Sequence, residues 1–150
     1  MVHGIAPVKN ILSILCAACL LQAMQLARAE EQRIVVVANA GSGIQSMSAK
    51  EVRRAYLGAS IVLNGVEVKP LLNQSDKLVT EMFLQKVLFM SADAFERQSI
   101  SRAFRGGSSP KVYTTLADLL AALKIDNAAI TFMAYDTAIV TPGIRIIFNP

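Results

Sequence analysis

Outside its first 29 residues, the chain has few side chains of the types that catalyse reactions or bind metals. Both cysteines of the chain, Cys16 and Cys19, and its single histidine, His3, lie in that segment. The rest of the chain has neither residue type, which excludes serine–histidine triads, cysteine nucleophiles, haem ligation by these residues and zinc sites built from them. A carboxylate pair or a serine–lysine dyad stays formally possible, but we expect a protein with no catalytic residue, no metal site and no cofactor.

One serine–lysine pattern needs a separate interpretation. The run Ser108-Ser109-Pro110-Lys111 matches the S-x-x-K motif of serine acyl-enzymes. That motif works at the start of a helix, where Pro110 is unfavourable, and the partner motifs S-D-N and K-T-G are missing. We interpret this segment as a polar loop.

Two short segments could bind a small anion through backbone N–H groups. Ser42 and Gly43 lie in a glycine-rich turn after a predicted strand, and Ser75 and Asp76 precede a predicted helix. Helix N-termini attract anions because their first N–H groups are unpaired and the helix dipole is positive there. These four residues are the candidate ligand-binding residues, although the charge of Asp76 opposes an anion. The alternative is that they form only a turn and a helix cap.

The N-terminal segment has the order of a secretory signal peptide. A positive start containing Lys9 is followed by the apolar run Ile11–Met24, the small-residue site Ala27–Ala29 and then acidic residues. We expect cleavage after Ala29, which leaves a periplasmic or secreted domain of residues 30–150. The alternatives are a lipoprotein that starts at Cys19 and a retained membrane anchor, for which the apolar run is short.

The net charge and composition of the chain limit the classes of molecule that it is expected to bind. The 150-residue chain has a formal net charge of +4, which falls to +2 when residues 1–29, with Lys9 and Arg28, are removed. This charge is too small to indicate a nucleic-acid-binding protein. A hydrophobic content of 53% indicates a folded domain with its own core.

The hydrophobic pattern predicts an α/β domain. The run Arg33–Ala38 is typical of a strand buried on both faces, and Asn64-Gly65 favours a hairpin whose second arm reaches Leu72. Pro70 marks this arm as an edge or as the end of the pairing. Further strands are predicted at 128–133 and 144–148, and helices from Ser48 to about Leu57, from about Lys77 to Phe89, from Ser91 to about Phe104 and after Thr115. Phe83 and Leu120 lie within apolar helical stripes and are expected to be nearly fully buried.

Taken in order, several segments resemble the periplasmic phosphate-binding proteins of ABC transporters, in their short single-lobe branch. The resemblance rests on Ile34–Ala38, Ser46–Gly58, Val68–Asn73, Phe83–Leu88, Phe104–Gly107 and Ala128–Met133. It implies a single periplasmic-binding-protein-like lobe with a central, mostly parallel sheet flanked by helices and a β-hairpin. It further implies a solute-binding role with phosphate or a similar oxyanion as ligand and an ABC transporter as partner. Where the family usually has a glycine–serine pair, this chain has Gln74-Ser75-Asp76.

A second functional interpretation stays open, because about 121 residues make only one lobe. The domain could be a protein-interaction or sensory accessory module without a small-molecule ligand, docking on a membrane transporter or sensor. Such a module needs exposed apolar surface, for which Ile61–Leu63 and Ile139–Ile147 are the candidates.

Overall fold

The computed structural model describes residues 32–150, of which Arg33–Pro150 form one compact unit. The predicted signal segment 1–29 lies outside the described residues. The unit consists of β1 (Ile34–Asn39), α2 (Ala49–Tyr56), β2 (Val62–Leu63), β3 (Val66–Glu67), β4 (Lys69–Asn73), α3 (Lys77–Phe83), η1 (Leu84–Leu88), α4 (Ala92–Phe104), β5 (Lys111–Tyr113), α5 (Leu116–Ile125), β6 (Ala129–Ala134), α6 (Tyr135–Val140) and β7 (Ile144–Phe148).

The central sheet has the strand order β5-β4-β6-β1-β7. Strand β4 is parallel to both β5 and β6, whereas β1 is antiparallel to β6 and to β7. Strand β7 therefore runs in the direction of β6, and β1 alone opposes the other four strands. The predicted α/β fold with a mostly parallel sheet is confirmed, with β1 as its reversed member.

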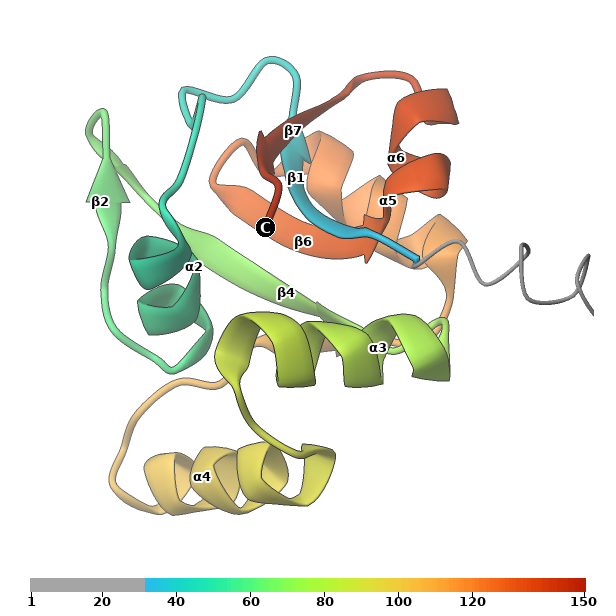
Figure 1. Ribbon diagram of the computed structural model, residues 1–150. Helices are drawn as coiled ribbons and strands as arrows, with labels where there is room; N and C mark the ends of the chain where they lie inside the picture. Colours follow the sequence, from blue (N-terminus) through green and yellow to red (C-terminus); the bar gives the residue numbers. More distant parts are fainter. Residues whose placement is uncertain (1–31) are drawn as a thin grey trace, which may run out of the picture. The chain divides into compact units, whose positions relative to one another are not determined.

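Strand β1 separates two hydrophobic cores because successive side chains of a strand point to opposite faces. Ile34, Val36 and Ala38 face the core that α2, α3 and η1 close. Val35 and Val37 face the second core, which includes Leu119 and Leu123 of α5 and Ala138 of α6. In Figure 1, α3 lies below the sheet with α4 beyond it, while α5 and α6 lie on the other side. This arrangement confirms that β1 is buried on both faces.

The hairpin is confirmed, but its second arm ends earlier than expected. Asn64 and Gly65 have φ angles of 50° and 78°, the left-handed values that a type I′ turn requires. The chain then leaves the hairpin and forms β4, which lies inside the large sheet and not at its edge. Pro70 is tolerated there because β5 pairs only from Leu71 onward, so no partner on that side needs its missing N–H.

The helix expected over 77–89 consists of two consecutive helical segments of different type. Helix α3 ends at Phe83, and residues Leu84–Leu88 continue as a π-helix. Phe89 then stops the helix in a left-handed conformation with a φ angle of 57°. Phe83 is fully buried, as predicted, and its ring stacks on Phe132 with a centroid distance of 3.8 Å.

The other predicted helices are confirmed, each with its expected cap. Ser48, Ser91 and Thr115 accept hydrogen bonds from the first turns of α2, α4 and α5. The expectation for Leu120 is wrong, because Leu119 and Leu123 are the residues that α5 buries and Leu120 is only half-buried. Strand β5 and helix α6 were not predicted.

Candidate functional site

Asn73 organises the turn at the carboxyl end of β4. Its side chain is buried, and its Nδ2 donates to the carbonyl oxygen of Phe132 on β6 at 2.9 Å. Its Oδ1 accepts from the backbone N–H of Ser75 at 3.0 Å and from the Ser75 hydroxyl at 2.6 Å. One amide thus ties the turn to the neighbouring strand. This role of Asn73 was not predicted, although an asparagine at the end of an apolar strand is a typical signal for a turn.

Asp76 occupies the position where an anion would meet α3. It is the N-cap of that helix, and its Oδ1 accepts from the N–H groups of Leu78 at 2.9 Å and Val79 at 3.2 Å. These are the donors that a helix N-terminus offers to a ligand. The carboxylate of Asp76 therefore occupies the two N–H donors that an external anion would need. Ser75 is not the cap, and its hydroxyl points back to Asn73.

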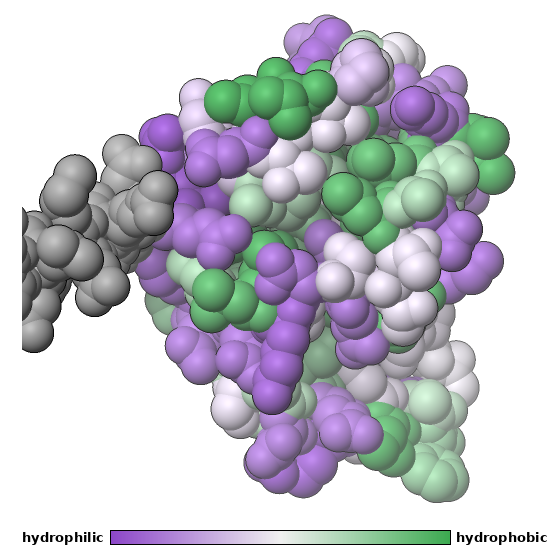
Figure 2. All heavy atoms as spheres, turned by 90° about the vertical axis from the view of Figure 1, so that its right-hand side faces the viewer, coloured by the Kyte–Doolittle hydropathy of each residue, from purple (hydrophilic) through white to green (hydrophobic). Residues whose placement is uncertain are grey.

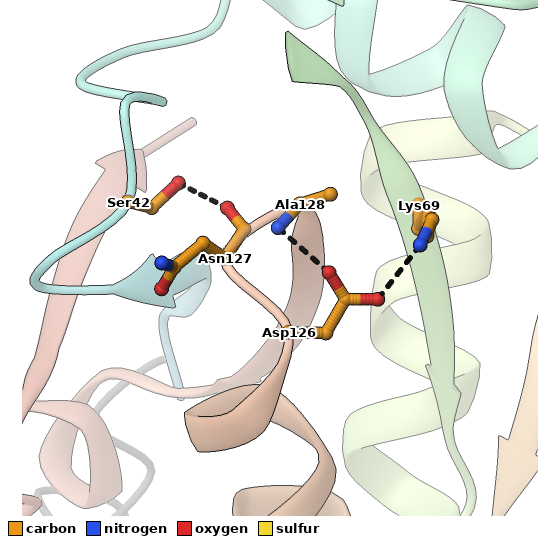
Figure 3. A network of polar contacts seen from close by, with 5 residues as sticks. All are labelled: Ser42, Lys69, Asp126, Asn127 and Ala128. Carbon is orange, nitrogen blue, oxygen red and sulfur yellow. Dashed lines mark hydrogen bonds and ion pairs between the residues drawn. The ribbon is translucent and has the colours of Figure 1, made fainter.

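Ser42 and Gly43 hold a different turn together. The Ser42 hydroxyl is buried, donates to the carbonyl of Asn127 at 2.5 Å and accepts from the N–H of Ile44 at 3.0 Å. The Gly43 carbonyl accepts from Asn64 Nδ2 in the hairpin at 2.9 Å. Figure 3 shows Ser42 directed at the segment that leads into β6. The Ser42 hydroxyl, a candidate ligand-binding group in the sequence, instead joins two loops.

The structure does not bring the four predicted residues together. Ile34 of β1 pairs with Ala134, and Ala38 pairs with Ile130, so the end of β1 lies beside the start of β6. The end of β4 lies at the opposite edge, because β4 and β6 are parallel. Ser42 and Gly43 are therefore at the amino edge of β4 and β6, and Ser75 and Asp76 at the carboxyl edge. This separation could not be predicted from the sequence, since strand direction is set by pairing and not by composition.

The positively charged side chain of Arg33 lies just before β1, at the carboxyl edge of β4 and β6. The guanidinium of Arg33 lies 4.0 Å from the centre of the Tyr135 ring, and the Arg33 carbonyl accepts from the Tyr135 N–H at 2.8 Å. Nearby on α3, Lys77 pairs with Glu81 at 3.8 Å across one helical turn. Figure 2 looks at this side of the molecule, where hydrophilic and hydrophobic residues are mixed and neither kind forms a continuous field.

The predicted apolar docking segments are only partly exposed. Val62, Ile139 and Val140 are exposed, whereas Ile61 and Ile147 belong to the core. Within residues 32–150, no three His, Cys, Asp or Glu side chains gather where they could hold a metal ion. No helix in this part of the chain is both long and apolar enough to span a bilayer.

Comparison with known proteins gives a likeness in structure alone. No protein-family model and no curated protein matches the chain. An ABC-type phosphate transport receptor from Vibrio cholerae has 11% sequence identity and a TM-score of 0.57. A possible phosphate binding protein from Planctomyces limnophilus has 13% identity and a TM-score of 0.52. The alignments cover 77% of this chain but only 45% and 40% of the other two. The chain therefore has the fold of a part of these binding proteins, less than half of their length.

Proposed function

We propose that the chain is an exported, non-catalytic solute-binding-like domain that takes phosphate or a similar oxyanion at the carboxyl edge of β4. The turn Asn73–Asp76 at the start of α3 carries this proposal. It places a hydroxyl and helix N–H donors at the edge where ligands bind in open α/β sheets. The likeness in fold to two proteins described as phosphate receptors supports it. In this proposal residues 1–29 are the export signal, residues 30–150 are the domain, and an ABC transporter is the membrane partner.

The proposal predicts weak binding in the natural chain. Asp76 already satisfies the N–H groups of Leu78 and Val79, and a second negative charge at contact distance is repelled. An oxyanion has to displace this carboxylate to reach the same donors. Ser75 also has to turn its hydroxyl away from Asn73. Binding therefore depends on how readily the cap opens.

The decisive variant is Asp76→Asn, because asparagine caps a helix about as well as aspartate without the charge. We expect phosphate, titrated calorimetrically, to bind Asp76→Asn about tenfold more tightly than the natural chain. Ser75→Ala weakens binding in the same background. Asp93→Asn is the matched control, since it removes one exposed carboxylate from the first turn of another helix, α4, and leaves affinity unchanged. Absence of phosphate and sulfate binding in all variants contradicts the proposal.

The interaction module is the second candidate, and the same carboxylate favours it. A helix N-terminus closed by its own chain needs no ligand, and the exposed side chains of Val62, Ile139 and Val140 offer apolar contact area. Under this interpretation, Asp76→Asn changes neither anion affinity nor stability. Cross-linking to a membrane transporter or sensor in whole cells, lost in Val62→Ser and Val140→Ser, is the observation that favours it.

The export step has its own test. N-terminal sequencing of the protein recovered from the periplasm is expected to begin at Glu30. A lipid-modified start at Cys19 indicates an anchored lipoprotein instead.

A further inference from the structure

A cleft of about 520 Å³ opens at the amino end of β4 and extends along β5 as far as Tyr113, the residue that pairs with Asn73. Its volume lies within the range of small-molecule sites, roughly 300–1,000 Å³. Val68, Pro70, Leu71 and Ala129 contribute apolar lining. Arg102, Lys111, Lys69, Glu67 and Asp126 contribute charges to the same lining. The cleft thus combines an apolar body with a few charged groups, which is the composition of a site for a small amphiphilic ligand.

Arg102 is fixed in this lining by the backbone around it. Its Nη1 donates to the carbonyl of Ser108 at 3.3 Å and reaches that of Tyr56 at 3.5 Å. Two glycines make room for its side chain, since a Cβ atom at Gly58 or Gly107 would lie 2.6 Å from it. The end of α2 and the loop after α4 therefore hold the arginine between them.

The charge of Arg102 has no counter-ion among residues 32–150. None of their carboxylates forms an ion pair with it, and its Nη2 is buried with no hydrogen-bond acceptor. The carboxylates of the cleft are engaged elsewhere. Asp126 binds Lys69 at 3.0 Å and the N–H of Ala128 at 2.9 Å, and Glu67 accepts from the Ser60 hydroxyl at 2.7 Å. Figure 3 shows Asp126 between Lys69 and Ala128. Leaving this one buried nitrogen without an acceptor costs free energy.

We propose that this cleft binds a small organic carboxylate. The carboxylate pairs with the Arg102 guanidinium after that side chain turns its buried Nη2 toward the cleft, and the exposed Lys111 adds a second positive charge. The carbon skeleton of the ligand lies on Pro70, Pro110 and Tyr113, which line the cleft and are partly exposed. An inorganic oxyanion would leave this apolar floor uncovered. The site is separate from the turn Asn73–Asp76 and goes beyond the solute-binding role proposed for that turn.

The test uses benzoate as the probe and benzyl alcohol as its neutral counterpart of similar shape. Each is titrated into the isotope-labelled full-length protein, and the amide resonances of Gly58, Gly107 and Lys111 report binding in the cleft. We expect benzoate to shift these resonances saturably, with an affinity about tenfold higher than that of benzyl alcohol. Equal affinities of the two probes, or no shift by benzoate, overturn the proposal.

Variants then show which positive charge of the cleft binds the carboxylate of benzoate. Arg102→Met is expected to lower benzoate affinity about tenfold and to leave that of benzyl alcohol unchanged. Lys124→Met on α5 is the matched control, because it removes one exposed positive charge outside the cleft. Lys111→Met gives a smaller loss and, as a change at an exposed side chain, serves if Arg102→Met does not fold. Equal affinities in all three variants overturn the role of the cleft charges.

A phosphate titration separates this site from the proposed oxyanion site. Phosphate is expected to shift the amide of Ser75, most strongly in Asp76→Asn, and to leave those of Gly58 and Gly107 in place. Failure of phosphate binding at Ser75 contradicts the proposed function and leaves the cleft proposal standing if benzoate binds. Phosphate shifts in the cleft as large as those of benzoate overturn the proposal that the ligand is organic.

Discussion

Replacing Asn73 tests whether one buried amide holds the carboxyl edge of β4 in place. Asn73→Ala removes three hydrogen bonds, of which one goes to the Phe132 carbonyl inside the sheet and two come from Ser75. At about 0.5–1.5 kcal/mol net for each bond, the expected loss of unfolding free energy is about 2–4 kcal/mol. The upper part of this range applies because the Phe132 carbonyl is left buried without this donor.

Two further variants show where that free energy resides. Ser75→Ala removes only the hydroxyl bond and is expected to cost about 1 kcal/mol or less. Asn73→Asp has the same shape and keeps the acceptor, but turns a carboxylate oxygen toward the Phe132 carbonyl. Burial and this carbonyl raise the pKa of the new carboxyl group in the folded state. The variant is therefore weakest at neutral pH, and it recovers as the pH falls and the carboxyl group gains a proton that it can donate.

Urea unfolding followed by far-ultraviolet circular dichroism measures all three variants, since the chain has no tryptophan to report by fluorescence. Asn73→Ala is expected to shift the midpoint at least twice as far as Ser75→Ala, with an unchanged slope. A cost of Asn73→Ala within about 0.5 kcal/mol of that of Ser75→Ala would refute the reasoning, because the bond to β6 would then contribute nothing measurable.

Three other predictions follow from the described contacts. Gly65→Val is expected to destabilise by about 1 kcal/mol or more and Gly65→Asn by clearly less, since no atom crowds the site and the cost is conformational; melting curves compare the two. Leu119→Ala costs about 2–5 kcal/mol and Leu120→Ala distinctly less, which equilibrium unfolding measures; equal costs contradict the assigned faces of α5. The hydrogen bond from Ala128 and the ion pair with Lys69 lower the pKa of Asp126 below its ordinary value near 3.8. Asp126 therefore stabilises the fold above that value and loses this contribution as pH falls through its lower folded-state pKa, so the stability gap between the natural chain and Asp126→Asn narrows in acid.

Local signals in the sequence predicted most elements of this fold. The capping box at Ser48, the Asn64-Gly65 turn and the cap at Thr115 each act within a few residues, and each has the expected partner. Such contacts depend on neighbours along the chain, so they can be identified without knowledge of the fold.

The candidate site was harder to predict because it depends on long-range pairing. The reversal of β1 places Ser42 at the opposite edge from Ser75, and no local pattern encodes that direction. The choice between Ser75 and Asp76 as N-cap depends on Asn73, which captures the serine hydroxyl. Arg102 has no sequence motif at all, since its setting arises from two glycines on separate segments.

The aspartate cap of α3 also affects how this domain can diversify. Aspartate codons become asparagine or glycine codons by a single base change, and the first of these substitutions keeps the helix start intact. A lineage carrying this chain is thus one point mutation from a helix start at the carboxyl edge that is capped without a negative charge. The reverse mutation would close that edge just as easily. Under the proposed function, gain and loss of anion affinity are therefore one base change apart, with little cost in folding.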